Sequence, residues 1–193
     1  MALSHIVAYV TGAGQGLGRA TALRFAKLGA RVCVVDLSEK AAKNVCDEIG
    51  TDKAIPFVVD VTNEEQVQNS ISKAVETFGK INVNVNCAGI AIGQKTLSKK
   101  GAHNLAQFAK VLNVNTIGTF NTLRLAAAAM ANNAADSDGL RGVIVNTASI
   151  AAFDGQIGQA AYAASKGAVV GMTLPIARDL SSFGIRVCTI APG

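Results

Sequence analysis

Residues 11–18 read Thr11-Gly12-Ala13-Gly14-Gln15-Gly16-Leu17-Gly18, and this glycine-rich stretch is the strongest indication of the fold. It follows an apolar run over residues 5–10 and opens a predicted helix over residues 18–28. Glycines at such a turn let backbone amides approach a pyrophosphate, which then lies at the N-terminus of the helix. Asp36 ends the next apolar run, residues 31–35, about 20 positions after the turn, where an acidic residue can bind a ribose. Together these features predict a dinucleotide-binding strand–helix–strand unit.

Short apolar runs rich in Val and Ile alternate with predicted helices along the rest of the chain. The further runs lie at residues 54–59, 81–85, 143–145 and 185–190. The predicted helices occupy residues 38–49, 63–78, 104–111, 115–130 and 159–182. Strands that alternate with helices pair in parallel through right-handed crossovers. The sequence therefore predicts a doubly wound parallel α/β sheet of six strands, the Rossmann fold, in a single domain over residues 1–193.

Two places depart from these patterns. Asn82 and Asn84 fall inside a predicted buried strand, where unpaired amides are costly. Pro175 lies inside the last predicted helix, where its missing backbone donor is expected to kink the chain.

The composition excludes several classes of protein. The 193 residues are 50% hydrophobic and 16% charged, which is typical of a globular domain and not of a disordered chain. No uncharged apolar run approaches the ~18 residues that span a bilayer, and the N-terminus lacks the pattern of a secretion signal or another clear targeting peptide. The four cysteines are scattered without a Cys-x-x-Cys pair, and only two histidines are present, so no metal site is predicted.

The charge is unevenly distributed along the chain. The net charge is +5, and no acidic residue lies between Thr77 and Ala135. This pattern is typical of a solvated positive surface, although such a surface also attracts nucleic acid, membrane lipid or a phosphate-bearing substrate. The basic residues of this acid-free stretch are Lys80, Lys95, Lys99, Lys100, Lys110 and Arg124.

Asp36 also predicts the choice of cofactor. At the end of the second strand its carboxylate is placed to accept hydrogen bonds from the hydroxyl groups of an adenosine ribose. A 2′-phosphate on that ribose would be repelled by the carboxylate. The predicted cofactor is therefore NAD and not NADP.

Three residues predict the chemistry: Ser149, which follows the fifth strand, and Tyr162 and Lys166 in the next helix. A spacing of four residues puts Tyr162 and Lys166 on one helical face. A phenol is a poor base near neutral pH unless a nearby positive charge favours its phenolate form. With Lys166 beside it, Tyr162 can exchange a proton with an alcohol or ketone oxygen while a nicotinamide exchanges hydride. Ser149 can donate a hydrogen bond to the same oxygen, so Ser149 and Tyr162 are the predicted substrate-binding residues.

These motifs together resemble the short-chain dehydrogenase/reductase superfamily over the whole chain. The resemblance also rests on Asp60-Val61 and Asn86-Cys87-Ala88-Gly89, which follow the third and fourth strands, and on the final Pro192-Gly193. It implies a catalytic set of Asn115, Ser149, Tyr162 and Lys166. In that set, Asn115 stabilises a backbone carbonyl that holds a water near Lys166. The implied cofactor contacts are Gly12, Gln15, Gly16, Leu17, Gly18, Asp36, Asp60, Val61, Asn86, Cys87, Ala88, Gly89, Tyr162 and Lys166.

Within the superfamily the chain is most similar to the 3-hydroxyacyl-CoA dehydrogenases of type 2, also called 17β-hydroxysteroid dehydrogenases of type 10. The similarity lies in residues 86–91, 131–141, 144–158 and 171–180. It implies a mitochondrial homotetramer that uses NAD to oxidise 3-hydroxyacyl-CoA thioesters and some steroids, with the cytoplasm as the alternative location. Two other functions stay open: a 3-oxoacyl-carrier-protein reductase, and a non-catalytic scaffold with RNA-processing partners in mitochondrial tRNA maturation. The complete set of four catalytic residues favours an enzyme over a scaffold.

The last expectation concerns the end of the sequence. Pro192-Gly193 resembles the turn that follows the sixth strand in the superfamily, where relatives continue for several dozen residues. A sixth strand without a neighbour would present a long apolar edge. We therefore expect the physical protein to be longer, with a C-terminal portion missing from this sequence.

Overall fold

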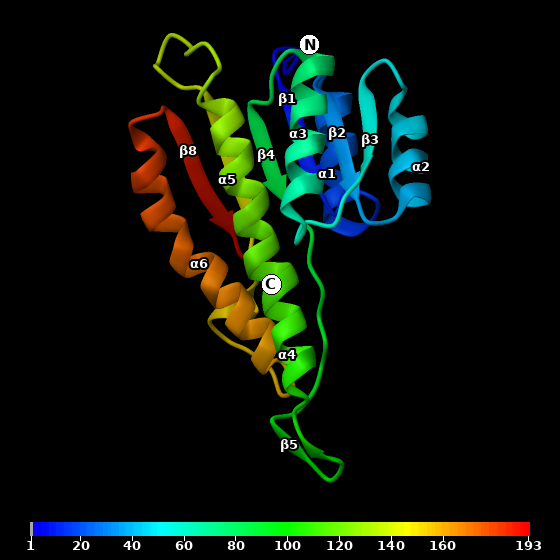
Figure 1. Cartoon of the computed structure of the whole chain (residues 1–193), viewed down its shortest axis with the longest axis vertical. Coiled ribbons are helices and arrows are strands. Elements are labelled where there is room, and N and C mark those ends of the chain that lie inside the picture. Colours follow the sequence, from blue (N-terminus) through cyan, green and yellow to red (C-terminus); the bar gives the residue numbers. More distant parts are fainter. Residues whose placement is uncertain (1) are drawn as a thin grey trace.

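The computed structural model of the protein describes residues 2–193. Its centre is a sheet in which all neighbouring strands are parallel, in the order β3-β2-β1-β4-β7-β8. The six-stranded doubly wound sheet predicted from the sequence is thereby confirmed (Figure 1). Strand order reverses between β1 and β4, and ligands of such sheets bind beyond the carboxyl ends of the strands at this point. The strands are β1 (Val7–Thr11), β2 (Arg31–Asp36), β3 (Ala54–Val58), β4 (Val83–Asn86), β7 (Gly142–Thr147) and β8 (Ile185–Ile190).

Helices cover the sheet in two layers (Figure 1). On one face α1 (Gly16–Lys27) and α2 (Glu39–Ile49) bury Ala22, Ala42 and Val45 against the strands. On the other face lie α3 (Glu64–Phe78), α5 (Gly118–Met130) and α6 (Ala160–Ser181). Pro175 lies inside α6 and does not end that helix. No helix among residues 2–193 is long and apolar enough to cross a membrane.

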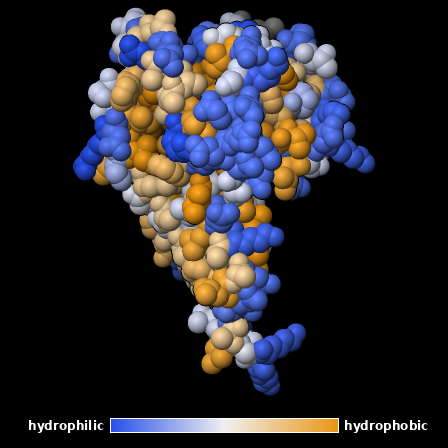
Figure 2. Space-filling model, viewed as in Figure 1, coloured by the Kyte–Doolittle hydropathy of each residue, from blue (hydrophilic) through white to orange (hydrophobic). Residues whose placement is uncertain are grey.

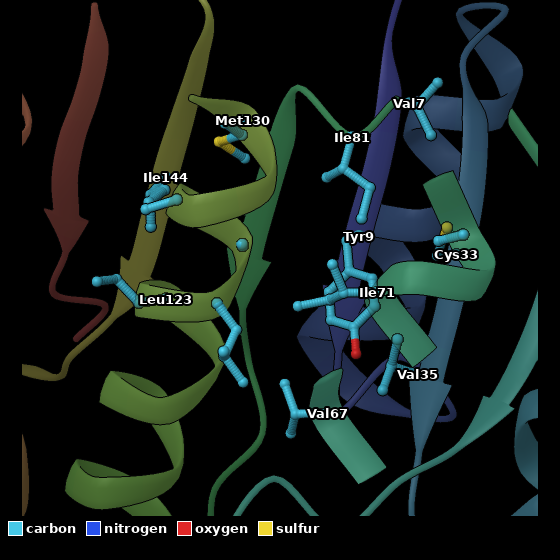
Figure 3. Close-up of a cluster of buried hydrophobic side chains, with 14 of the residues drawn as sticks. Val7, Tyr9, Cys33, Val35, Val67, Ile71, Ile81, Leu123, Met130 and Ile144 are labelled. Atoms are coloured by element: carbon cyan, nitrogen blue, oxygen red, sulfur yellow. The ribbon is translucent and has the colours of Figure 1, made fainter. Parts of the chain in front are cut away.

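The larger hydrophobic core lies between the sheet and α3, α5 and α6 (Figure 3). Alternation along β1 sends Val7 and Tyr9 into this core and Ala8 and Val10 into the core on the opposite face. Tyr9 is fully buried, and its hydroxyl shares a hydrogen bond of 2.6 Å with Ser70 Oγ. Burial raises the pKa of Tyr9 far above its usual value, so this phenol stays neutral and structural.

The structure explains the asparagines in the strand predicted over residues 81–85. That strand begins at Val83, so Asn82 lies before it, where its Oδ1 accepts from Val7 N at 2.8 Å. Asn84 is fully buried and donates from Nδ2 to Tyr9 O and to Asn86 Oδ1, both at 3.3 Å. Asn86 Nδ2 returns a bond to Asn84 Oδ1 at 2.8 Å and donates to Asn146 Oδ1 at 2.9 Å. Side-chain hydrogen bonds thus connect β1, β4 and β7, while Asn146 Nδ2 is buried without a hydrogen-bond partner among the described residues.

The helices predicted over residues 104–111 and 115–130 are both present, but no break separates them. The structure shows α4 (Leu105–Leu112), a π-helical segment (Asn113–Ile117) and α5 in direct succession. Asn104 caps this rod, because its Oδ1 accepts from Gln107 N at 3.1 Å. No glycine or proline separates residues 111 and 115, so no residue type there favours a break. Single π-helical turns inside α-helices are frequent at functional sites.

Three short elements were not predicted, two strands and one 3₁₀ turn. Strands β5 (Leu97–Ser98) and β6 (Gly101–Ala102) pair antiparallel in a hairpin that projects beyond the body of the protein (Figure 1). A 3₁₀ turn (Ile150–Ala152) follows Ser149. Each is too short for sequence periodicity to reveal.

Candidate active site

In the glycine turn between β1 and α1, side chains are excluded either by the backbone conformation or by close neighbouring atoms. Gly12 and Gly16 have φ angles of +61° and +54°, which disfavour other residues. A Cβ on Gly18 would lie 2.2 Å from Gly12 O, and one on Gly14 would lie 2.7 Å from Ala41 Cβ. α1 begins at Gly16, and the side chain of Gln15 caps none of its first N–H groups. Those N–H groups can donate hydrogen bonds to the pyrophosphate of a dinucleotide. The exposed Leu17 lies in the same first turn of α1.

Asp36 lies at the end of β2 and braces this turn. Its Oδ2 accepts from Gly14 N and its Oδ1 accepts from Ser38 N, each at 2.9 Å. A carboxylate oxygen accepts two hydrogen bonds, so each oxygen keeps capacity for a further donor. Asp36 is therefore fixed in place with acceptor sites left for the hydroxyl groups of a ribose.

Asp60 and Val61 follow β3 at the same edge of the sheet. Asp60 Oδ1 accepts from Thr62 N at 2.9 Å and from Thr62 Oγ1 at 2.7 Å. Val61 is buried, and its carbonyl accepts from Asn121 Nδ2 at 2.9 Å. A Cβ on Gly118 would lie 2.6 Å from Val61 Cγ2, so α5 packs directly on this segment.

The segment after β4 links the glycine turn to the catalytic residues. Ala88 N donates to Thr11 Oγ1 at 3.2 Å, and a Cβ on Gly12 would lie 2.8 Å from Ala88 N. A Cβ on Gly89 would lie 3.2 Å from Asn115 Oδ1 and 3.8 Å from Lys166 Nζ. The backbone of residues 86–89 thus has one side against the cofactor turn and the other against the predicted catalytic residues.

Cys87 lies in this segment with its side chain toward β7. Its Sγ is 3.6 Å from Thr147 Oγ1, and burial raises the pKa of the thiol. A thiol of this kind stays protonated and packs as a small apolar group.

Asn115 is fully buried within the π-helical segment. Its Oδ1 accepts from Ile90 N at 2.8 Å and its Nδ2 donates to Ile90 O at 2.9 Å, so one amide holds both backbone groups of Ile90. Nδ2 also donates to Ser165 Oγ at 3.0 Å, and that hydroxyl donates to Tyr162 O at 2.7 Å. Asn115 is therefore tied to the helix turn that carries Tyr162 and Lys166.

Lys166 is buried next to Tyr162. Its Nζ donates to Thr147 O at 2.6 Å and lies 5.6 Å from the centroid of the Tyr162 ring. Burial lowers the pKa of Lys166 below the usual lysine value, because desolvation disfavours the ammonium. None of the ion pairs among residues 2–193 involves Lys166. A buried ammonium without a carboxylate partner stands beside a phenol, at the edge where the cofactor turn lies.

Ser149 follows β7 at that same edge. Its Oγ accepts from Ala151 N at 3.1 Å, which leaves the hydroxyl hydrogen available for a further acceptor. In the described part of the chain it makes no hydrogen bond to Tyr162. The structure thus links Asn115 through Ser165 to the backbone of Tyr162, sets Lys166 Nζ beside the Tyr162 ring, and places Ser149 separately at the adjacent strand end.

The sequence did not point to Ser165 or to the carbonyl of Thr147. The resemblance implied a backbone carbonyl bound by Asn115, and the structure identifies it as that of Ile90. A serine between Tyr162 and Lys166 carries no distinctive spacing of its own. Backbone groups leave no trace in residue type. Only the position of Ser165 three residues after Tyr162 could have suggested that it contacts the same helical turn.

Comparison with known proteins agrees with this geometry. The family model of short chain dehydrogenases matches residues 6–193. The chain is 56% identical to the 3-hydroxyacyl-CoA dehydrogenase type-2 of Drosophila melanogaster over 193 residues, 99% of this chain and 75% of that protein. It is 52% identical to the human protein of that name over 190 residues, 97% of this chain and 72% of that protein. The crystal structure of 3-hydroxyacyl-CoA dehydrogenase type-2 from Mycobacterium avium superimposes with a TM-score of 0.93 at 40% identity, covering 97% of this chain and 74% of that one. The chain therefore belongs to the short-chain dehydrogenase family, and it is an oxidoreductase that uses a nicotinamide cofactor.

Proposed function

We propose that this protein is an NAD-dependent dehydrogenase that oxidises the 3-hydroxyl group of 3-hydroxyacyl-CoA thioesters to a ketone. The observation that carries the proposal is the buried Lys166 ammonium, which lies beside the Tyr162 ring and is anchored to Thr147 O. The substrate class is supported by the 50–56% identity to enzymes named 3-hydroxyacyl-CoA dehydrogenase type-2.

In this proposal Tyr162 is the general base. Its Oη takes the hydroxyl proton of the substrate, and the positive charge of Lys166 lies beside its ring. Ser149 Oγ donates a hydrogen bond to the same substrate oxygen and orients it. A bound nicotinamide supplies the acceptor for the hydride that leaves the carbinol carbon. Asn115 and Ser165 keep the Tyr162 turn in position and are not themselves acid or base.

NAD is the proposed dinucleotide. The residues that would hold it are the backbone of 12–18, Asp36 at the ribose, and the segments 60–61 and 86–89. The fit rests on three features of the structure: the uncapped start of α1, the excluded Cβ positions at Gly14 and Gly18, and the free acceptor capacity of Asp36. The negative charge of Asp36 disfavours a 2′-phosphate, which supports NAD over NADP.

We also propose a homotetramer in mitochondria. Both follow from the resemblance to type-2 dehydrogenases. The oligomer is further supported by exposed apolar side chains along the α4–α5 rod, namely Leu105, Ile117 and Phe120. Sedimentation of the purified protein and fractionation of cells that express the full-length protein test the two proposals separately.

The direct test is the appearance of NADH with a panel of substrates. The panel contains 3-hydroxyacyl-CoA esters of increasing chain length, a hydroxysteroid and an unrelated secondary alcohol, each with NAD and with NADP. We expect NADH from the CoA esters and little reaction with NADP. A protein that only reduced 3-oxoacyl-carrier-protein with NADPH would contradict both the substrate class and the cofactor.

A further inference from the structure

A hollow lies at the amino edge of the sheet, opposite the candidate active site. It has a volume of about 590 Å³ and is bordered by the starts of β4, β7 and β8 and by the loop of residues 131–141. Figure 1 shows this loop, which follows α5, at the end of the molecule opposite the β5–β6 hairpin. A strand rises about 3.3 Å per residue, so the six residues of β7 place Thr147 about 17 Å from Gly142. The hollow is therefore distinct from the proposed dehydrogenase site.

Positive side chains outnumber negative ones around the hollow. Lys80, which belongs to the acid-free stretch of the sequence, lines it together with Arg141 and Arg186. Asp136 is the one carboxylate among the lining residues that the structure describes. No ion pair within residues 2–193 involves any of these four side chains. Asp136 Oδ1 instead accepts from two backbone N–H groups of its own loop, at 3.0 Å and 2.8 Å, so the three positive charges are left to a ligand.

Arg141 is held in place with part of its guanidinium free. Its Nε donates to Asn133 O at 3.1 Å and its Nη1 donates to Phe183 O at 3.2 Å. A guanidinium carries five N–H groups, and within residues 2–193 the other three donate to no protein acceptor. Arginine binds phosphate through parallel hydrogen bonds from such a planar fork. Arg141 is thus oriented for an oxyanion before any ligand arrives.

The wall of the hollow formed by the loop of residues 131–141 is fixed by backbone contacts. Arg141 N donates to Gly184 O at 2.8 Å. Asn133 Nδ2 donates to Ile81 O at 2.8 Å and to Arg141 O at 3.0 Å, which ties the loop to the segment before β4. A Cβ on Gly184 would lie 2.2 Å from Gly139 O, so the two segments are in direct contact. A wall that is already ordered lowers the entropy lost when a ligand binds.

We propose that this hollow binds a small polyphosphorylated anion, either free diphosphate or a metabolite that carries two phosphate groups. A phosphate group carries about −1.5 to −2 charges near neutral pH, so three cations suit two phosphates better than a single carboxylate. The volume of about 590 Å³ lies within the roughly 300–1,000 Å³ of small-molecule sites. Arg141 binds one phosphate through its free N–H groups, and Lys80 and Arg186 neutralise the remaining charge. The inference does not depend on the proposed function, because it uses no residue of the site at Tyr162.

The test variant is Lys80→Gln with Arg186→Gln in the full-length protein. Neither side chain takes part in an ion pair within residues 2–193, so the change removes no contact of that kind from the fold. Exposed charge pairs are individually weak, and we expect the loss of both to weaken binding of the anion by about tenfold at low ionic strength. Salt screens these charges, so the difference from the wild type shrinks when ionic strength is raised.

Titration calorimetry measures the binding, with inorganic pyrophosphate and fructose 1,6-bisphosphate as probes and fructose as the uncharged control. Binding at the glycine turn is common to all variants, so the difference between variants reports on the hollow. The matched control is Arg24→Gln with Lys110→Gln, which removes two exposed charges outside the hollow and leaves both affinities unchanged. Arg141→Lys keeps the charge without the planar fork, and we expect it to bind both probes more weakly.

The two probes separate the two sources of the phosphate groups. Tighter binding of the bisphosphate by the wild type assigns the hollow to a phosphorylated metabolite, and tighter binding of pyrophosphate assigns it to the free diphosphate. Equal affinity of the wild type and the Lys80/Arg186 variant for both probes overturns the inference. So does a preference for a transfer RNA over both probes that is lost in the same variant, because the hollow would then be part of a nucleic-acid interface.

Discussion

Among its single residues, the candidate site depends most on Lys166, whose side chain is almost fully shielded from solvent. Lys166 is 6% exposed, donates to one carbonyl and has no acidic neighbour. Such a group is retained in a core only where its charge has a use, because burying an unpaired ammonium is costly. In the proposed reaction that use is proton transfer at Tyr162, because the charge of Lys166 lies beside the Tyr162 ring.

Changing Tyr162 to Phe removes the phenolic hydroxyl and keeps the ring. We expect turnover to fall by about 10²–10⁴-fold, the usual contribution of a general acid or base, while NAD binding persists. Steady-state rates and calorimetric NAD binding measure the two effects. A Phe variant with nearly the wild-type rate would falsify the role assigned to Tyr162.

The lowered pKa of Lys166 predicts a pH dependence of cofactor binding. Burial favours the neutral amine, so Lys166 loses its proton at a lower pH than an exposed lysine, whose pKa is about 10.4. NAD should bind with full affinity at pH values below this lowered pKa. The affinity should fall as the pH rises through the pKa. Calorimetry across the alkaline range checks this, with Lys166→Arg as the control that keeps its charge. Constant affinity up to the ordinary lysine pKa would contradict it.

Asp36 predicts the cofactor preference. In Asp36→Ala the repulsion of a 2′-phosphate and the acceptors for the ribose are both lost. We expect the ratio of kcat/KM for NAD over NADP to fall by at least about tenfold, which corresponds to one strong hydrogen bond to a charged group. A wild-type enzyme that preferred NADP in paired assays would show that the carboxylate does not select the cofactor.

At the scale of elements, the amides of β4 and β7 join the strand ends that carry the site. Asn86 leads into the backbone segment that lies between Gly12 and Lys166, and Asn146 precedes the carbonyl that accepts from Lys166 Nζ. Asn84 is the inner member of this chain of amides. Because its polar atoms lie in the core, the bonds among these amides are necessary for stability.

Replacing Asn84 with Val keeps the volume and removes the bonds to Tyr9 O and to Asn86. We expect a loss of about 1–3 kcal/mol in the free energy of unfolding, since Asn86 is left with a partly unpaired buried amide. Urea unfolding measures it. Asn132→Ala removes the amide of an exposed asparagine and should change the free energy of unfolding by less than about 0.5 kcal/mol. Equal stability of the two variants would show that the buried amides contribute little.

At the scale of the whole molecule, apolar side chains gather on the face formed by α4, α5 and α6 (Figure 2). Phe120 and Ile117 are 45% and 55% exposed on the same rod. Such a patch is typical of a surface that pairs with another subunit. The oligomer proposed above would bury it.

Phe120→Glu should therefore lower the oligomer mass in sedimentation. A buried Phe contributes about 1.5–3 kcal/mol, so its loss weakens association at least tenfold. Val58→Glu, on the edge strand at the far side of the sheet, is the control, because Val58 is 52% exposed and lies away from the rod. If both variants sediment like the wild type, the face is not a subunit interface.

The order of the six sheet strands and of the helices between them, the glycine turn and the acidic residue that ends β2 could all be predicted from the sequence. These features depend on local requirements: a period of two or 3.6 in apolar residues, a backbone without Cβ, and a charge at a strand end. The same local logic identified Ser149, Tyr162 and Lys166 as candidates, and the resemblance to the short-chain dehydrogenases added Asn115; the roles of all four in catalysis stay predictions.

The contacts that fix these candidate residues in place could be seen only in the tertiary structure. The carbonyl of Thr147 beneath Lys166, the backbone of Ile90 on Asn115 and the amides of Asn84, Asn86 and Asn146 join residues far apart in sequence. The register of neighbouring strands and the packing of α5 and α6 on the sheet bring these groups together. No local pattern encodes such contacts, because each requires two distant segments to arrive at the same place in the fold.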